Sequence, residues 1–284
     1  MRYNARGVVQ PLMSWWVALV LGVVEGLTEY LPVSSTAHLI LAQRALGIVA
    51  SEEANAFAIC VQLGAIAAVL GVFFARVRSM ALGVLGRDPA GRSLAINVVL
   101  GFLPAAVLGK LFDKAIERRL FGLYPVVAAW FVGGVVILVL HATKRDRRPG
   151  RAITTLTARD ALVIGLAQCL AMWPGTSRSL ATLVAGLLVG LSVEAALEYS
   201  FLLGLVTLSA ATGYKLLKSG PVMLHAYGPV SLAVGFLAAA VSALIAVRWM
   251  LSYLRGHGLQ VFGIYRVLLA LTVTALLATG LLHP

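Results

Sequence analysis

Two carboxylates stand inside an apolar stretch near the N-terminus and could do chemistry there. Glu25 and Glu29 are four residues apart in GVVEGLTEYLPVSSTAH, so on a helix they share one face. A carboxylate at membrane depth is costly and usually functional. Two like charges about one turn apart favour a shared cation, or protonation of one of the pair. We therefore predict that the pair binds a cation or accepts a proton; the alternative is an interfacial pair that faces lipid headgroups.

A single arginine stands inside a second apolar stretch, in the segment WPGTSRSLAT. The planar guanidinium of Arg178 presents a rigid donor fork that suits phosphate oxygens. Gly175 lets the backbone approach a ligand closely. The other candidate substrate contacts here all bear hydroxyl groups: Thr176, Ser177, Ser179 and Thr182. We predict that this segment binds the anionic part of a substrate.

Both segments are broken by proline, and hydroxyl side chains follow each break. In the first segment they are Ser34, Ser35 and Thr36. Such residues commonly cap helices, and a free helix N-terminus attracts anions. Capping alone would explain either group of hydroxyls. Two such groups, together with the acid pair and the arginine, indicate an anion site between two half-helices.

Two further ionisable residues stand in apolar surroundings. His38 lies three residues after Ser35 and is either a packing residue or a proton carrier that contacts substrate. Glu198 is a third acid inside an apolar run. We expect Glu198 to form a structural ion pair with Arg178 or Arg266.

These side chains match the needs of phosphoryl chemistry. The reaction requires positive charge near the non-bridging oxygens, a nucleophile and a proton acceptor. Arg178, the half-helix ends and a divalent ion would supply the charge, a serine or water the nucleophile, and a glutamate or histidine the acceptor. Because the surroundings are apolar, the rest of the substrate should be a hydrocarbon chain. The residues thus predict a membrane site for a phosphorylated lipid.

The composition of the chain indicates that such a site would lie inside a membrane protein. Of 284 residues, 60% are hydrophobic and only 12% are charged, which excludes an ordinary soluble domain and a disordered chain. The formal net charge of +12 would indicate nucleic acid binding in a soluble protein. In this chain it indicates cytoplasmic loops beside anionic lipid, so we expect the bilayer and not nucleic acid as the partner.

The apolar runs predict an all-α polytopic membrane protein with a single membrane domain over residues 1–284. Six runs have the length of a spanning helix: 55–75, 94–112, 123–141, 196–214, 229–247 and 262–282. Two other stretches, 13–48 and 159–191, are too long for one span, too short for two, and broken by proline. We interpret both as re-entrant helical hairpins, which are tolerated where protein buries them.

The order of these elements repeats. Residues 22–27 align with 165–170, and Ser34 aligns with Ser177 at the same separation. One hairpin followed by three spans occurs twice, over residues 13–141 and 159–282. Because three is an odd number, the two halves must be inverted, which places a binding site near the midplane between them.

Basic residues predict the orientation in the membrane. The loops 76–92 and 142–159 would lie on one side, and the second of these is the densest basic loop. Positively charged loops favour the cytoplasm. Both termini should then be extracytoplasmic, and the sequence leaves a homodimer open.

The two site segments resemble motifs of the undecaprenyl-diphosphate phosphatase family, also called bacitracin-resistance proteins. The first motif runs from Glu25 to His38 and the second from Trp173 to Thr182. Supporting matches follow in the same order along nearly the whole chain: VQLG at 61–64, PAAVLG at 104–109, FLL at 201–203 and IYR at 264–266.

This resemblance implies a bacterial inner-membrane enzyme that hydrolyses undecaprenyl diphosphate to undecaprenyl phosphate and inorganic phosphate. The activity recycles the lipid carrier of cell-wall synthesis and confers bacitracin resistance, with a divalent cation, Mg²⁺ or Ca²⁺, as cofactor. The roles implied at matching positions are cation binding or base catalysis for Glu25 and Glu29, nucleophile for Ser35 with Ser34 close by, proton carrier for His38, and diphosphate binding for Arg178, Ser177 and Thr182.

Four positions depart from the family pattern, and one other function fits the residues. Relatives often have glycine at the positions of Ala37 and Leu180. They often have an acid at the position of Ala58 and a proline at that of Val206. None of these changes removes a proposed catalytic group, but together they leave room for an altered substrate preference.

The alternative function is a transporter or flippase of polyprenyl phosphate lipids, which would use the same anion site without needing a nucleophile.

Overall fold

The computed structural model describes residues 2–3, 9–10, 14–48, 52–120 and 122–282. Two short strands, β1 (Arg2–Tyr3) and β2 (Val9–Gln10), pair antiparallel, and nearly everything else is helical. The α-helices are α1 (Trp15–Glu29), α2 (Ser35–Ala45), α3 (Glu52–Val72), α4 (Phe74–Val84), α5 (Pro89–Leu120), α6 (Leu123–Ala142), α7 (Ala158–Gln168), α8 (Arg178–Leu188), α9 (Val193–Gly256) and α10 (Gln260–Ala278). Short 3₁₀ turns lie at Arg145–Arg147, Ile153–Thr155 and Cys169–Met172.

The prediction of an all-helical membrane protein is confirmed. Within the described residues, five helices are long and apolar enough to span a membrane, or six if α3 and α4 count as one bent span. Helix α9 contains two of them, separated at Gly228, whose φ of +69° interrupts the helix. Many apolar side chains on the outer faces of these helices are exposed, as expected for surfaces that contact lipid.

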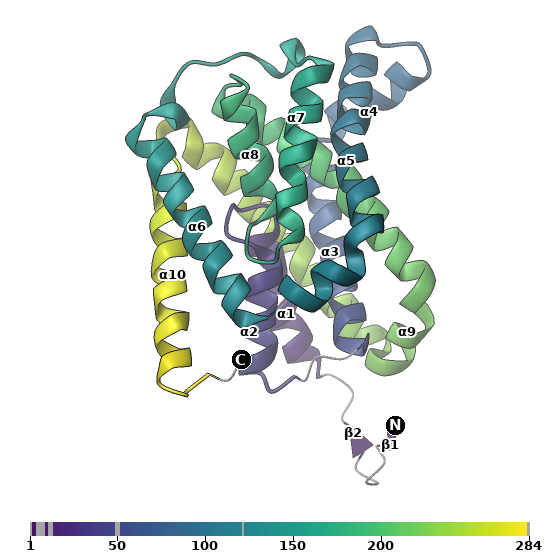
Figure 1. The fold of residues 1–284 in the computed structure, drawn as a ribbon. Helices are drawn as coiled ribbons and strands as arrows, with labels where there is room; N and C mark the ends of the chain where they lie inside the picture. Colours follow the sequence, from purple (N-terminus) through teal and green to yellow (C-terminus); the bar gives the residue numbers. More distant parts are fainter. Residues whose placement is uncertain (1, 4–8, 11–13, 49–51, 121, 283–284) are drawn as a thin grey trace.

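The prediction that residues 76–92 form a loop is wrong. Helix α3 bends by 81° into α4, and only a short turn separates α4 from α5. The apolar pattern missed α4 because its exposed arginines, Arg76 among them, lower the hydropathy of a segment that is nevertheless helical. The elbow brings this basic helix over the end of the bundle, where it packs against α5 (Figure 1).

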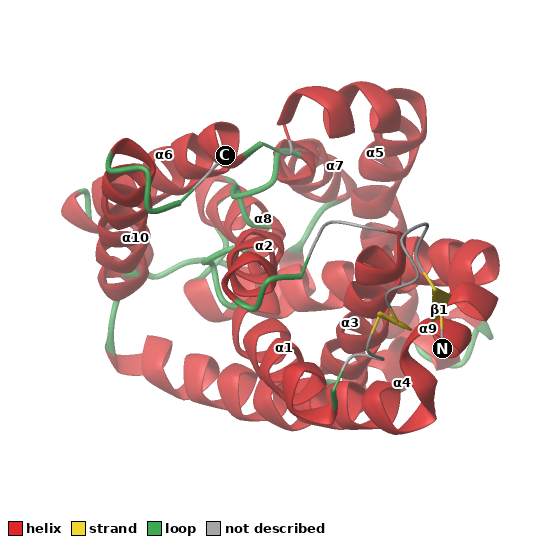
Figure 2. Ribbon diagram, turned by 90° about the horizontal axis from the view of Figure 1, so that it is seen from below, coloured by secondary structure: helices red, strands yellow, loops and turns green. Residues whose placement is uncertain are grey.

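The two segments interpreted as hairpins do fold back on themselves. Figure 1 shows α1 and α2 entering the bundle from the end where the N-terminus lies, and α7 and α8 entering from the opposite end. The turns that join each pair lie at mid-height. Seen from below, α2 and α8 lie near the middle, with α6 and α10 on one side and α3 and α9 on the other (Figure 2). The bundle therefore surrounds the two hairpin tips.

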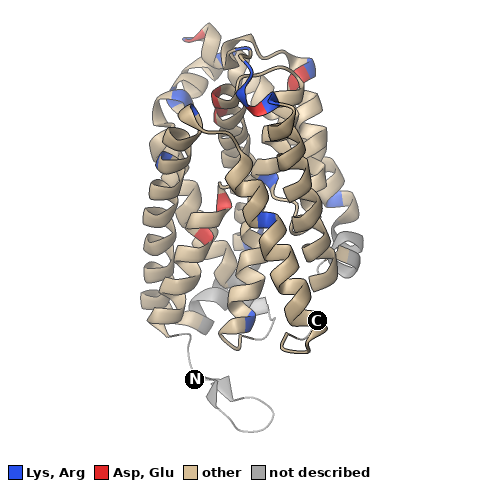
Figure 3. Cartoon of the chain, turned by 90° about the vertical axis from the view of Figure 1, so that its left-hand side faces the viewer, with Lys and Arg blue, Asp and Glu red and all other residues tan. Residues whose placement is uncertain are grey.

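Charged residues are distributed unevenly along the bundle. Most of them gather at the end that carries the α4–α5 turn and the α6–α7 loop, and few lie at mid-height (Figure 3). At the charged end, Asp146 accepts hydrogen bonds from the Leu259 amide and, at 2.9 Å, from His141 Nδ1. This buried carboxylate joins the α6–α7 loop to the start of α10. The few charges at mid-height lie where the hairpin tips meet.

Candidate active site

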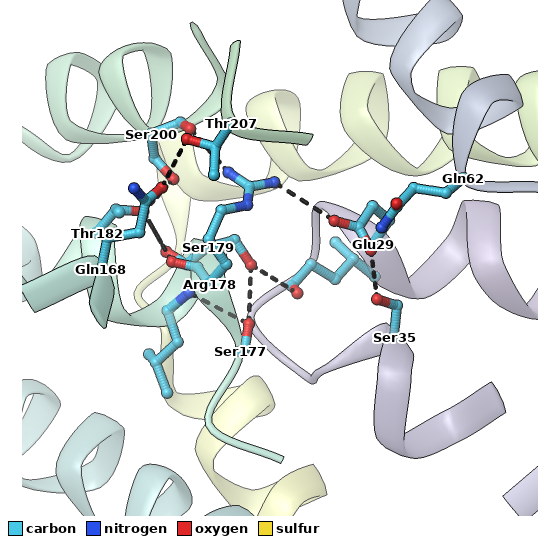
Figure 4. Close-up of polar contacts among 12 residues, drawn as sticks. Glu29, Ser35, Gln62, Gln168, Ser177, Arg178, Ser179, Thr182, Ser200 and Thr207 are labelled. Atoms are coloured by element: carbon cyan, nitrogen blue, oxygen red, sulfur yellow. Dashed lines mark hydrogen bonds and ion pairs between the residues drawn. The ribbon is translucent and has the colours of Figure 1, made fainter. Parts of the chain in front are cut away.

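A cavity of ≈ 260 Å³ lies between the tips of the two hairpins. Its polar lining comes from both hairpins and from the helices around them. These residues are Glu29, Ser34, Ser35, Thr36, Gln62, Gln168, Ser177, Arg178 and Thr207, and the glycines are Gly109 and Gly175. Together with apolar residues such as Met172 and Leu208, these polar side chains line one cavity inside an apolar bundle (Figure 4).

The first hairpin carries the acids and a hydroxyl that points at one of them. Helix α1 ends at Glu29, and α2 begins after Ser34, whose φ of +74° turns the chain sharply. Ser35 Oγ donates a hydrogen bond to Glu29 Oε2. Glu25 lies one turn earlier and is 2% exposed, and its Oε2 has no hydrogen-bond partner among the described residues. The arrangement places a hydroxyl, its proton acceptor and a second carboxylate next to one another.

The second hairpin repeats this turn but carries the opposite charge. Ser177 also has φ +74°, and its Oγ caps α8 by accepting from the Leu180 amide at 3.3 Å. Arg178 is the first residue of α8, and its Nη1 donates to the Ser200 carbonyl at 2.9 Å. A Cβ at Gly204 would overlap the guanidinium, so glycine there provides the room that Arg178 occupies.

Part of the Arg178 donor fork is free. Its Nη2 lies 3.6 Å from Glu29 Oε1, which is an ion-pair distance but too long for a hydrogen bond. Both Nη2 and Nε are buried and have no hydrogen-bond partner among the described residues. Guanidinium donors bind phosphate oxygens in pairs. The free edge of the fork therefore fits a phosphate group in the cavity.

Arg266 holds the two hairpin tips in place. Its side chain is fully buried on α10 and donates to Pro32 O at 3.1 Å in the first tip and to Gly175 O at 2.7 Å in the second. It also donates to the carbonyls of Ala129 and Trp130 on α6. One cation thus ties both breaks to the surrounding helices.

The expected pairing of Glu198 with Arg178 or Arg266 is wrong. Glu198 pairs with Arg76 instead, at 2.5 Å between Oε1 and Nε. The α3–α4 elbow, which the apolar pattern missed, brings Arg76 to this position. The two other arginines bind backbone carbonyls and leave Glu198 to a structural ion pair away from the cavity.

Five of the predicted site residues do not line the cavity, and the first of them is Glu25, one turn before Glu29 on α1. Ser179 Oγ donates to the Leu31 carbonyl at 2.9 Å, and Thr182 Oγ1 lies 2.6 Å from Ser200 Oγ, so both tie α8 to its neighbours. The Thr176 amide closes the turn by donating to Trp173 O. The last of the five is His38, on α2.

Both ring nitrogens of His38 are already bonded. Nδ1 lies 2.7 Å from the Ser34 carbonyl, and Nε2 lies 2.7 Å from the Tyr265 hydroxyl. The ring stacks on Tyr265 and meets Trp130 edge-on. His38 thereby supports the backbone of Ser34, while its role as a proton carrier stays a prediction.

Three polar side chains that line the cavity had no role predicted from sequence: Gln62, Gln168 and Thr207. Thr212 donates to Gln62 Oε1 at 2.8 Å, and Thr207 donates to Gln168 Oε1 at 3.2 Å. Each glutamine is thus held by a threonine of α9. Two signals were available in the sequence: Gln62 lies in the VQLG match at 61–64, and Gln168 stands opposite Glu25 in the alignment of the repeat segments.

The acid pair fits a divalent cation only together with a phosphorylated substrate. Among the described residues, no three His, Cys, Asp or Glu side chains gather as a metal-binding cluster. Mg²⁺, however, is usually bound by one or two carboxylates, substrate phosphates and water. The unpartnered Oε2 of Glu25 supplies a ligand of the right type. The chemistry of Glu25 and Glu29 therefore fits a cation that a phosphorylated substrate would also bind.

Comparison with known proteins shows the family of this chain. The family model described as bacitracin resistance protein BacA matches residues 18–272. The chain belongs to the BacA family. An undecaprenyl-diphosphatase of Sorangium cellulosum is 46% identical over 265 residues, covering 92% of this chain and 86% of the relative. Relatives named undecaprenyl-diphosphatase 2 in Rhodospirillum rubrum and undecaprenyl-diphosphatase in Acidovorax ebreus are 45% and 44% identical, each covering 93% of this chain and 95% of the relative.

The departures from the BacA pattern lie away from the cavity lining. Ala37 packs near Trp130 and Leu180 is buried in the main core. Ala58 and Val206 pack against the edges of the cores. None of the four is among the residues that line the cavity. Their effect would therefore reach a substrate only through helix packing.

Proposed function

We propose that this BacA family member hydrolyses undecaprenyl diphosphate to undecaprenyl phosphate and inorganic phosphate in the bacterial inner membrane. The observation that carries the proposal is the partly free Arg178 fork facing the hydrogen-bonded Ser35–Glu29 pair across one small cavity. Relatives named undecaprenyl-diphosphatase support the substrate. The surrounding apolar helices suit its hydrocarbon chain.

The residues divide the reaction between the two hairpins. Arg178, at the start of α8, holds the terminal phosphate and neutralises its non-bridging oxygens. Ser35 Oγ attacks the terminal phosphorus and its proton passes to Glu29, while the bond to the bridging oxygen breaks and undecaprenyl phosphate leaves. Water then attacks the phosphoserine, releasing inorganic phosphate and restoring Ser35.

A divalent cation, Mg²⁺ or Ca²⁺, fits this scheme on the acid side of the cavity. Glu25 and Glu29 would hold it, and it would supply positive charge to the diphosphate oxygens. In the cell, the reaction would return the lipid carrier to cell-wall synthesis. It would also remove the diphosphate to which bacitracin binds, and so confer resistance.

Our proposal for the topology is one membrane domain built from inverted repeats, residues 13–141 and 159–282. Hairpins that enter from opposite ends support the inversion, as does the shared φ of +74° at Ser34 and Ser177 (Figure 1). The end that carries the basic α6–α7 loop would face the cytoplasm. Both termini would then be extracytoplasmic.

A second candidate function is transport of polyprenyl phosphate lipids between leaflets. Opposed hairpins support it, because inverted repeats with broken helices are common in transporters. A transporter needs the anion site but no nucleophile. Phosphate release and the Ser35 hydroxyl therefore distinguish the two candidates.

The test is phosphate release from undecaprenyl diphosphate by purified protein in detergent, with and without a chelator. Detergent micelles have no leaflets, so transport alone gives no product. We expect release that stops on chelation and returns with Mg²⁺ or Ca²⁺. Ser35→Ala should lose activity, whereas Thr274→Val on α10, whose hydroxyl donates to the Ala270 carbonyl of the same helix at 2.7 Å, should keep it. Absence of phosphate release together with lipid movement in vesicles would favour the transporter.

A further inference from the structure

Gln168 has a buried amide group with no assigned role. It is the last residue of α7, is 3% exposed, and lines the cavity between the hairpins. Its Oε1 accepts a hydrogen bond from Thr207 Oγ1 at 3.2 Å. Its Nε2 is buried and has no hydrogen-bond partner among the described residues. Figure 4 shows Gln168 and Thr207 beside Arg178, across from Glu29.

A buried donor that makes no hydrogen bond destabilises the structure that holds it. Such a donor in a cavity is satisfied when a ligand brings an acceptor. Arg178, which lines the same cavity, also has unsatisfied donors. The unsatisfied donors of Gln168 and Arg178 therefore fit a ligand that carries several hydrogen-bond acceptors.

We propose that Gln168 is a substrate-binding residue whose Nε2 donates to a non-bridging oxygen of the diphosphate. The inference rests on the proposed phosphatase function and adds a second recognition group beside Arg178. Thr207 is the positioning residue: its hydroxyl occupies the amide oxygen and leaves the NH₂ group for the ligand. The site then binds the anion through the charged guanidinium of Arg178 and the neutral amide of Gln168.

The position of Gln168 in the second hairpin explains why an amide stands there. In sequence, its segment aligns with the one that contains Glu25. A carboxylate at Gln168 would keep the bond to Thr207 through one oxygen but would present negative charge to a phosphate. An amide keeps the same shape and presents a donor.

The test compares three substitutions in detergent-solubilised protein, measuring kcat and KM for undecaprenyl diphosphate. Gln168→Met removes the donor at similar volume, and we expect kcat/KM to fall about tenfold, the value of one hydrogen bond to a charged group. Gln168→Glu should fall further, about 100-fold, because it adds repulsion. Thr207→Val should lower kcat/KM about threefold, and Thr207→Ser should restore it.

A binding measurement separates recognition from folding. Inorganic pyrophosphate should raise the melting temperature of the wild type, and Gln168→Met should need about tenfold more pyrophosphate for the same rise. Equal kcat/KM and equal pyrophosphate response in Gln168→Met and the wild type would overturn the inference. If Gln168→Glu or Gln168→Met does not fold, the Thr207→Val and Thr207→Ser pair decides by the same two readouts. A wild type that binds pyrophosphate but releases no phosphate from the lipid would refute the proposed function instead.

Discussion

The two hairpins at the centre of the molecule share a backbone design but differ in chemistry. Each consists of a helix, a break that contains proline, a serine with φ +74°, and a second helix. The first hairpin carries Glu25 and Glu29, while the second carries Gln168 and Arg178. One backbone geometry thus presents acidic groups from one end of the bundle and donor groups from the other.

The serines of the two turns are also used differently. Ser177 Oγ caps its own helix by accepting from the Leu180 amide, whereas Ser34 makes no such capping bond. Next to Ser34, the Ser35 hydroxyl donates to Glu29. In the second hairpin Ser177 caps a helix, whereas in the first hairpin Ser35 donates to a carboxylate that can accept its proton. A repeated turn can therefore hold a reacting group in one hairpin and a binding group in the other.

The largest effect should come from removing the charge of the second hairpin. Arg178→Ala should lower kcat about 1000-fold, because loss of a preorganised donor to developing negative charge costs 10²–10³ in rate and this residue is also the cation nearest the cavity. Arg178→Lys should recover only part of the activity, since an ammonium lacks the planar fork. Phosphate release checks both variants, and Arg178→Ala with wild-type turnover would contradict the site assignment.

The next effect should come from making the first hairpin resemble the second. Glu25→Gln places an amide where the cation would bind, as at Gln168. We expect phosphate release to fall about 100-fold and half-activation to need a higher Mg²⁺ concentration, because one anionic ligand is lost. A titration with Mg²⁺ measures the shift. An unchanged activation curve would show that Glu25 does not contact the cation.

Loss of the residue that joins the hairpins should affect stability more than chemistry. Arg266→Met removes donors to the carbonyls of Pro32 and Gly175 and leaves those groups buried. We expect the free energy of unfolding to fall by about 3 kcal/mol or more, since hydrogen bonds to charged groups contribute about 1.5–3 kcal/mol each. Thermal unfolding in detergent checks this expectation. A melting temperature equal to that of the wild type would refute the role of Arg266 as a clamp.

The smallest effect should come from an ion pair outside the cavity. Arg76 is 45% exposed in its pair with Glu198, and exposed pairs contribute about 0–1 kcal/mol. Arg76→Ala should therefore leave KM unchanged and shift the melting temperature only slightly. The same assays serve for the measurement. A large loss of activity would mean that the acids and bases outside the hairpins also belong to the site.

The sequence predicted the elements that depend on local pattern. Run lengths and the prolines at 32 and 174 located both hairpins, and residue types identified Glu29, Ser35 and Arg178, which the structure brings to one cavity. Helix α4 was missed because charge on an exposed helix resembles a loop in an apolar chain. Pattern methods detect periodic burial, and α4 lies too near the surface to show it.

The remaining features depend on contacts between segments far apart in the chain. Arg266 reaches Pro32 across 234 positions, and Arg76 reaches Glu198 across 122. No local pattern specifies which arginine meets which carbonyl or carboxylate. The unpartnered amide of Gln168 is likewise visible only once Thr207 is seen to occupy its oxygen. The sequence therefore shows which side chains are able to form hydrogen bonds or ion pairs, but not which partners they contact in the fold.

We propose that both hairpins form one catalytic site, and a double-mutant cycle across the two hairpins would measure their coupling. Glu29 and Arg178 face each other at 3.6 Å, so their contributions should be coupled. Phosphate release would be measured for Glu29→Gln, Arg178→Lys and the double variant. We predict that the double variant loses about as much activity as the more impaired single variant. A double variant whose loss equals the product of the two single losses would contradict the claim, because independent sites give multiplicative effects.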